Sequence, residues 1–165
     1  MSDVQLSRDL GFLRVGAAVP ALRVADVDFN VRAIVEVLRK AKEEGVQVLV
    51  LPEMALTGYT IGDLVHHAAL LTRAEEGLSD ILKESAGNGR LMVVGMPLCV
   101  DQRIFGCAVV LNSGRVLGVI PKTLLPSHRE FYEDRWFSPA RDARTETIEL
   151  AGEKVPFGTD ILFQL

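Results

Sequence analysis

The chain has 165 residues, of which 48% are hydrophobic and 24% are charged, and its formal net charge at pH 7 is −4. This composition predicts one folded domain with a substantial core, and it excludes a disordered chain. Lysine and arginine residues are scattered, and no basic run is interleaved with aromatic residues, so we expect no nucleic-acid partner.

The apolar runs are of strand length, and none is long enough to span a bilayer, so we expect no membrane association. The N-terminal sequence MSDVQLSRDLGF has no apolar signal core, which favours a cytoplasmic location. Cys99 and Cys107 lie inside apolar stretches and fit a reducing compartment better than a disulfide framework.

The beginning of the chain predicts a strand, a helix and a second strand. Residues 12–20, FLRVGAAVP, are a short apolar run of strand length. Apolar residues then recur at helical spacing from 31 to 41, with Asp26 or Asp28 as candidate N-cap and Gly45 after the end. The apolar run at 46–51 is typical of a strand buried on both faces. Two strands joined in this way should lie parallel, with a right-handed crossover.

The following pattern predicts two more helices and a group of antiparallel strands. Residues 62–72 and 74–86 have helical character, and 91–98 form another buried strand. The strands predicted at 104–111 and 115–120 flank Asn-Ser-Gly, which is typical of a hairpin. Beyond residue 121 the pattern loosens into a charged and aromatic loop, with weaker strand candidates at 146–150 and 160–165. The predicted class is therefore α/β with mixed sheets.

Glu53 is the first candidate for chemistry. It follows Pro52 at the end of the buried strand 46–51 and precedes a loop that contains Gly58. In open α/β folds such strand ends collect ligands, because the sheet holds the backbone rigid while the loops vary. The alternative is that Glu53 only caps or salt-bridges a loop.

Lys122 stands in the same context, directly after Pro121 and an apolar strand. Opposite charges at two strand ends can meet, although a strand-end lysine is more often a solvated residue. Charged and aromatic residues are unusually dense from 129 to 137. The alternative explanation for that segment is a salt-bridged loop fixed by aromatic packing.

Other familiar kinds of site lack the necessary pattern. His66 and His67 are adjacent on a predicted helix, so their side chains diverge, and we expect no metal site. Cys107 lies in a predicted strand interior, away from Glu53, and neither it nor Cys99 has a cationic neighbour or helix N-terminus to activate the thiol. No GxGxxG or GxxxxGK[ST] motif supports nucleotide binding.

Three segments together resemble a known family. LPEMALTGYTIGDL resembles the segment around the catalytic glutamate of the carbon-nitrogen hydrolases of the nitrilase superfamily, and GVIPKTLLPSHREFYEDRWF resembles their lysine segment. The PK, REFYE and RWF pattern is similar to one branch, the glutaminase domains of glutamine-dependent NAD+ synthetases. GCAVVLNSGRVLGVIPK resembles the hairpin of that branch and implies a structural role for its cysteine.

The resemblance implies three catalytic roles. Glu53 would be the general base, Lys122 would stabilise the oxyanion, and Glu130 would match the second glutamate that orients the lysine.

It also implies a glutamine pocket lined by Tyr59, His128 and Glu133. His128 departs from the tyrosine expected at its position.

The family fold is an α-β-β-α sandwich, and the third member of its triad is a cysteine that would lie beyond Leu165. The resemblance thus implies that residues 1–165 are the N-terminal part of a glutaminase domain, inactive alone, within a longer polypeptide. L-glutamine would be the substrate, and no cofactor would be needed for its hydrolysis. ATP, Mg²⁺ and deamido-NAD would belong to a synthetase domain outside this chain, and the full-length protein would be a homo-oligomer. A stand-alone nitrilase-type amidase and a non-catalytic structural fragment remain the alternatives.

Overall fold

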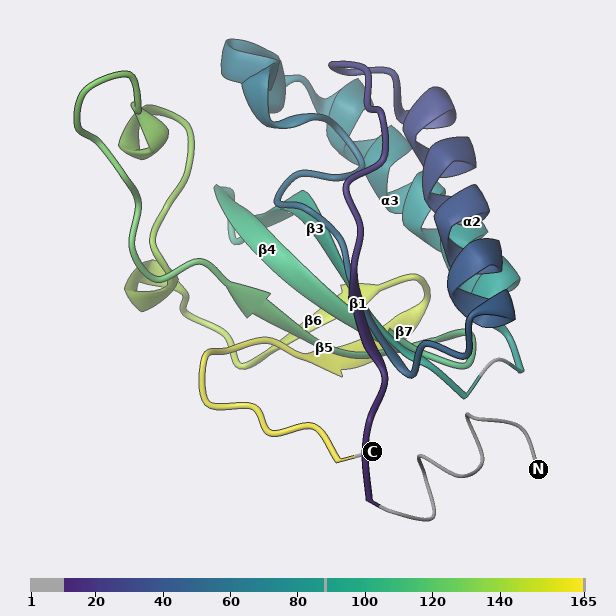
Figure 1. Ribbon diagram of the computed structural model, residues 1–165. Helices are drawn as coiled ribbons and strands as arrows, with labels where there is room; N and C mark the ends of the chain where they lie inside the picture. The colour runs from purple at the N-terminus through teal and green to yellow at the C-terminus, as the bar shows by residue number, and fades with distance from the viewer. Residues whose placement is uncertain (1–10, 88, 165) are drawn as a thin grey trace.

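The computed structural model describes residues 11–87 and 89–164 (Figure 1). Within these residues the main sheet has five strands in the spatial order β1-β2-β3-β4-β5. The strands are β1 (Val15–Ala17), β2 (Val48–Val50), β3 (Leu91–Val100), β4 (Arg103–Asn112) and β5 (Arg115–Pro121). The pairs β1–β2 and β2–β3 are parallel, whereas β3–β4 and β4–β5 are antiparallel. The α/β fold with a mixed sheet is therefore confirmed.

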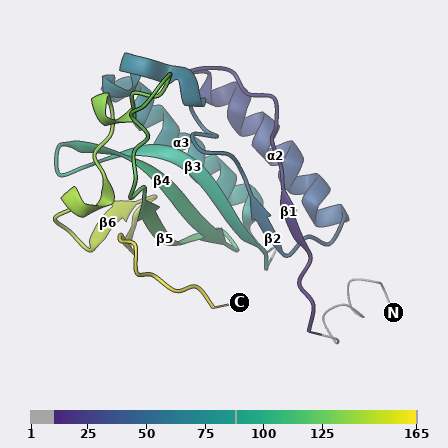
Figure 2. The ribbon, with the colours of Figure 1, turned by 60° about the vertical axis from the view of Figure 1, so that its left-hand side comes forward.

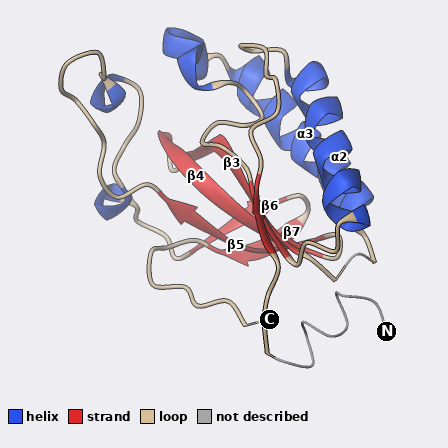
Figure 3. Cartoon of the chain, viewed as in Figure 1, coloured by secondary structure: helices blue, strands red, loops and turns tan. Residues whose placement is uncertain are grey.

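Two long helices, α2 (Val27–Glu43) and α3 (Ala68–Ser85), cover one face of this sheet (Figures 1 and 3). The helix α2 begins where Asp26 Oδ1 accepts a hydrogen bond of 3.0 Å from Phe29 N. Its apolar positions Ile34 and Leu38 are buried in the same core as Met92 of β3. The amphipathic pattern of the sequence thus places the helix on the sheet.

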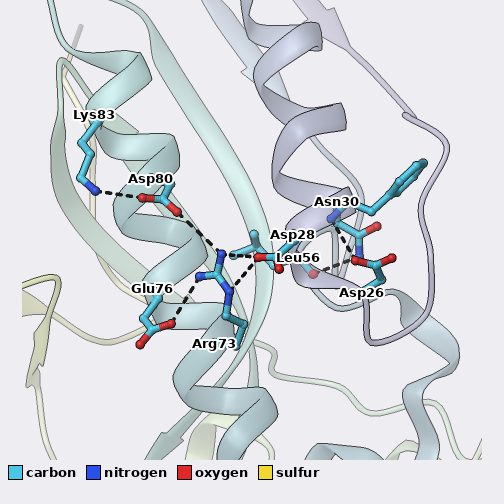
Figure 4. A network of polar contacts seen from close by, with 9 residues as sticks. Asp26, Asp28, Asn30, Leu56, Arg73, Glu76, Asp80 and Lys83 are labelled. Atoms are coloured by element: carbon cyan, nitrogen blue, oxygen red, sulfur yellow. Dashed lines mark hydrogen bonds and ion pairs between the residues drawn. The ribbon is translucent and has the colours of Figure 1, made fainter.

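The two helices pack closely at Gly77 of α3. A Cβ atom at this position would lie 2.8 Å from a methyl carbon of Val27, so only glycine permits the approach. On the outer side, Arg73 of α3 forms ion pairs with Asp28 of α2 and with Asp80 of its own helix (Figure 4). These contacts join the two elements into one layer.

A second sheet is formed by β6 (Thr147–Leu150) and β7 (Glu153–Pro156). Phe157, directly after β7, bridges Val119 of β5 and packs edge-to-face against Phe105 with the ring centroids 5.6 Å apart. The hairpin therefore continues the main core beyond β5.

In the part of the chain that the structure describes, three short 3-10 helices lie in the connections: η1 (Tyr59–His66), η2 (Glu133–Arg135) and η3 (Ala140–Asp142). The loop that carries η2 and η3 is drawn in green and projects beyond the end of β5 (Figure 2). Among the described residues, none of the helices has the length and apolar character to cross a membrane.

Two expectations about elements are wrong. The helix break predicted near residue 73 falls at His67, whose extended backbone ends η1 and precedes an uninterrupted α3. Residues 160–164 form no strand, because the Phe163 ring and Ile161 side chain pack across Gly118 instead of pairing with it. Residue 165 lies outside the described part. The partner of β6 is β7, which the pattern did not predict.

The sheet face opposite the helices is partly open. Met92, Val94 and Met96 of β3 are buried in the helix-side core, so the alternating positions Val93 and Gly95 lie on the opposite face. On β1 and β2, at one edge of the sheet, Val15 is 69% exposed and Val50 is 43% exposed. The described residues thus form one layer of helices on one face of the five-stranded sheet, with the opposite face of that sheet partly open.

Candidate active site

Glu53 is carried over the open face of β3 by the turn after β2. Leu51 N donates to Val93 O over 3.0 Å, and Leu56 N donates to Gly95 O over 3.3 Å. A Cβ atom at Gly95 would lie 2.5 Å from Pro52 O and 2.7 Å from Glu53 Cα. The absence of a side chain at Gly95 therefore lets the Glu53 turn lie directly on the strand.

The turn is strained and is held from two sides. Met54 is fully buried and has a φ of 55°, a left-handed conformation that is unusual for a bulky residue. Its carbonyl oxygen accepts a hydrogen bond of 2.7 Å from Gly58 N. Asn30 of α2 is also fully buried, and its Nδ2 donates to Leu56 O over 3.0 Å (Figure 4). The strained backbone at Met54 is thus fixed by packing and hydrogen bonds.

A small second core lies beneath the site, and we call it the satellite core. It joins the Glu53 turn, η1, α3 and the segment after η2. Its buried members are Met54, Ile61, Val65, Leu71 and Phe137. Trp136 packs against it and is partly buried.

Lys122 leaves the end of β5 toward the Glu53 turn. Its backbone is fixed at both ends, by Lys122 N donating to Gly106 O and by Ala140 N donating to Lys122 O, each over 2.8 Å. Its Nζ donates to Glu53 Oε1 and Oε2 over 3.0 and 3.2 Å. The predicted meeting of these two charges, 69 residues apart, is confirmed.

Glu133, and not Glu130, is the second carboxylate beside the lysine. Lys122 Nζ donates to its Oε1 and Oε2 over 2.9 and 2.7 Å, and the Glu133 side chain is only 2% exposed. The Tyr59 hydroxyl donates to Glu133 Oε1 over 2.6 Å. Glu130 is exposed, because the chain turns at Arg129, where φ is 57, before η2 brings Glu133 inward. The predicted position of Glu130 is therefore corrected.

These contacts affect two ionisable groups. Burial lowers the pKa of Lys122, but hydrogen bonds to Glu133 and Glu53 outweigh this effect and raise the pKa above its ordinary value. Burial and the hydrogen bond to Glu133 raise the pKa of Tyr59. Around neutral pH the lysine is thus a fixed ammonium, and the tyrosine is a fixed hydrogen-bond donor.

The pocket residues predicted from the sequence separate into two groups. Tyr59 and Glu133 meet at the lysine. His128 is exposed, and its ring lies beside that of Phe131 with the centroids 6.1 Å apart.

A hollow of about 410 Å³ opens beside Glu53 and Lys122 on the open face of the sheet. Its floor is largely apolar, and the two charged side chains lie at its edge. The residues that line it are Val50, Leu51, Pro52, Glu53, Val93, Gly95, Gly106, Cys107, Ala108, Ile120, Pro121, Lys122 and Thr123. An apolar recess with a few convergent polar groups is the usual form of a small-molecule site.

Comparison with known proteins agrees with this geometry. The sequence profile of the carbon-nitrogen hydrolases matches residues 14–161. The chain belongs to the carbon-nitrogen hydrolase family. It is 40% identical over 153 residues to the glutamine-dependent NAD(+) synthetase of Mycobacterium tuberculosis, a match that covers 93% of this chain and 22% of that protein.

Solved structures show the same fold. The glutamine-dependent NAD(+) synthetase from Cytophaga hutchinsonii matches with a TM-score of 0.85 and 28% identity, over 93% of this chain and 26% of that one. An amidase from Nesterenkonia sp. matches in fold, with a TM-score of 0.66 and 20% identity over 87% of this chain and 54% of the amidase. The chain thus spans about a quarter or less of the length of these synthetase relatives.

Cys107 of this carbon-nitrogen hydrolase lies closer to the site than the sequence predicted, since it lines the same hollow as Glu53. Its thiol nevertheless points elsewhere. A Cβ atom at Gly106 would face Glu53 Oε1, and successive strand residues alternate between faces. The Cys107 thiol is buried 3.6 Å from Phe105 O, and burial raises its pKa. The geometry therefore gives no support to Cys107 as a nucleophile.

Asp63 is a polar residue, missed by sequence reasoning, that contacts the segment carrying Glu133. It lies in η1, and its carboxylate accepts hydrogen bonds from Arg135 and Trp136, whose donation lowers its pKa. The unusual density of charged and aromatic residues after 129 was the available signal, but it did not indicate a partner 72 residues away. Within the described ranges, no group of three or more His, Cys, Asp and Glu side chains is placed to hold a metal ion.

Proposed function

We propose that this chain carries the proton-transfer and oxyanion-binding half of a glutaminase. One observation supports this most strongly: the Lys122 ammonium lies between Glu53 and the buried Glu133, beside an apolar hollow. The names of the synthetase relatives support L-glutamine as the substrate. The ammonia released would serve the ATP-dependent amidation of deamido-NAD in a synthetase domain outside this chain.

The reaction needs a nucleophile that Glu53 can activate. Glu53 would take the proton from a cysteine thiol as the sulfur attacks the glutamine carboxamide carbon. The same carboxyl would then give this proton to the departing ammonia, leaving a thioester. In the second half it would take a proton from water, whose attack releases glutamate and restores the thiol. We propose that this cysteine lies beyond Leu165, as in the family that the sequence resembles.

Lys122 would donate to the oxyanion in both tetrahedral intermediates. A single donor of this kind contributes roughly 3 to 4 kcal/mol to the transition state in enzymes where it has been removed. Glu133 would keep the ammonium charged and correctly oriented, because it contacts Lys122 through both carboxylate oxygens and is almost inaccessible to water. Tyr59, 41% exposed, would present its ring to the bound glutamine while its hydroxyl stays on Glu133.

The test uses the complete synthetase polypeptide and two nitrogen sources. We expect Glu53→Gln and Lys122→Met each to abolish NAD formation driven by glutamine while leaving formation driven by added ammonia intact. Selective loss is expected because only the ammonia source is broken.

Matched controls are available on α3. Glu76→Gln and Lys83→Met make the same substitutions at exposed ion-paired residues and should leave both activities unchanged. Loss of both activities in the Glu53 and Lys122 variants would contradict the proposal and would indicate a role in folding.

A further inference from the structure

The segment η1 contacts η2 and the residue after it at two points. Its first residue, Tyr59, donates its hydroxyl hydrogen to Glu133. Four residues later, Asp63 accepts hydrogen bonds from Arg135 and Trp136, residues that lie 72 and 73 positions away in the sequence. The segment η1, which begins with Tyr59, therefore also holds η2, which carries Glu133, the buried partner of Lys122.

Asp63 binds its partners through both carboxylate oxygens. Oδ1 accepts from Arg135 Nε over 3.0 Å and from Trp136 Nε1 over 2.8 Å, and Oδ2 accepts from Arg135 Nη2 over 3.0 Å. The paired arginine donors fix the plane of the carboxylate as well as its distance. The indole N–H of Trp136 donates a third hydrogen bond to the same carboxylate, from a rigid ring.

An exposed ion pair alone contributes little, and both Asp63 and Arg135 are mostly exposed. The difference here lies in Trp136, which packs against the satellite core and is ordered by that packing. Its backbone N donates to Glu133 O over 3.0 Å, and the next residue, Phe137, donates to the same oxygen over 2.8 Å. A shift of Trp136 is therefore also a shift of Glu133.

We propose that Asp63 is a positioning residue of the active site, holding η2 so that the Glu133 carboxylate faces the Lys122 ammonium. This inference rests on the proposed function for its catalytic consequence, whereas its structural part stands on the contacts alone. Without Asp63, η2 would keep its packing on the satellite core but lose its link to η1. Glu133 would then sample positions farther from the lysine.

Two substitutions of graded severity test this role. Asp63→Ala removes all three hydrogen bonds. Asp63→Asn keeps an Oδ1 atom able to accept the two bonds from Arg135 Nε and Trp136 Nε1. Asp28→Ala is the matched control, because Asp28 is an exposed aspartate that accepts from Arg73 Nε over 2.9 Å and joins α2 to α3 in the helix layer (Figure 4).

Three readouts separate positioning from general destabilisation. The indole N–H resonance of the single tryptophan reports the Asp63 contact directly in the 165-residue chain. The ¹H–¹⁵N resonance of the Lys122 ammonium reports whether its carboxylate partners are in place. In the complete synthetase polypeptide, kcat for glutamine hydrolysis reports the catalytic consequence.

For Asp63→Ala we expect a shifted indole resonance, a broadened Lys122 resonance and a kcat lowered about tenfold. This loss is smaller than the roughly hundredfold loss that follows a misplacement of reacting groups by about 1 Å. Asp63→Asn should lose no more than about threefold, since it keeps two of the three bonds, and Asp28→Ala should match the wild type in all three readouts.

An Asp63→Ala protein with a shifted indole resonance but unchanged Lys122 resonance and kcat would overturn the inference. So would an equal loss in Asp28→Ala. If the wild type itself fails to hydrolyse glutamine, the proposed function fails. The Lys122 resonance then decides the positioning role by itself: broadening in Asp63→Ala upholds it, and no change refutes it.

Discussion

Replacing Gly95 with alanine should disable Glu53 without touching any side chain of the site. The added methyl group would lie 2.5 Å from Pro52 O, 2.6 Å from Met54 N and 2.7 Å from Glu53 Cα, whereas ordinary contact begins near 3.4 Å. All three neighbours are backbone atoms, so the whole turn has to retreat by about 1 Å. A displacement of this size can cost about a hundredfold in rate, and overpacking typically costs about 1 to 3 kcal/mol in stability.

Gly106→Ala is the matched control on the neighbouring strand. There the added methyl would come within 3 Å only of Met54 Cε, at 2.9 Å, and would lie at the ordinary contact distance of 3.8 Å from Glu53 Oε1. Because Met54 Cε is the end of a flexible side chain, we expect a loss of stability below about 1 kcal/mol. Urea unfolding of each variant chain measures the free energies, and glutamine hydrolysis by the complete polypeptide measures the rate. A Gly95→Ala protein as stable and as active as Gly106→Ala would refute the account of how the turn is positioned.

Further predictions concern the charged cluster and its supports. Lys122→Met should destabilise the chain by about 3 kcal/mol, because the buried Glu133 carboxylate loses its ammonium partner and keeps only the hydrogen bond from the Tyr59 hydroxyl. The double variant with Glu133→Gln should recover part of that loss in a double-mutant cycle, and additive losses would contradict the coupling. The pKa of Lys122 is raised in the folded protein, so its charge should stabilise the fold fully below its ordinary pKa of about 10.5. This contribution should disappear as the pH rises through the higher pKa of the folded state. Lys122→Met lacks the contribution, so its free energy of unfolding should fall less at alkaline pH than that of the wild type. In a spectrophotometric titration the phenolate band of Tyr59, assigned with Tyr59→Phe, should form well above the ordinary tyrosine pKa of about 10; a normal midpoint would show that its hydrogen bond to Glu133 is absent in solution. Asn30→Ala should cost about 1 to 3 kcal/mol in urea unfolding, since it removes the side-chain donor from the buried carbonyl of Leu56, and a neutral result would rule out its anchoring of the Glu53 turn.

The sequence predicted the main sheet and the meeting of Glu53 with Lys122 because both depend on local patterns. Each charged residue directly follows an apolar strand and a proline, and the order of strands in a βαβ unit followed by hairpins brings their ends together. Helix α2 was equally predictable, since its N-cap residue, its apolar spacing and the lysines near its C-terminus all indicate a helix with these bounds.

The sequence pattern could not predict whether Glu130 or Glu133 contacts Lys122. Both glutamates lie in an irregular segment without a period, and the left-handed turn at Arg129 decides which one points inward. The contact of Asp63 with Trp136 joins two such segments through side chains alone. Strand β7 was missed because its four residues, EKVP, include two charges and a proline and give no apolar alternation.

Ammonia release from L-glutamine tests the central claim most directly. The claim is that Glu53, Lys122 and Glu133 form a catalytic unit that requires a cysteine beyond Leu165, and groups that act as one unit are strongly non-additive. We predict background release by the 165-residue chain and clear release once the polypeptide extends through that cysteine. Turnover by the 165-residue chain itself, abolished by Cys107→Ala, would contradict this account.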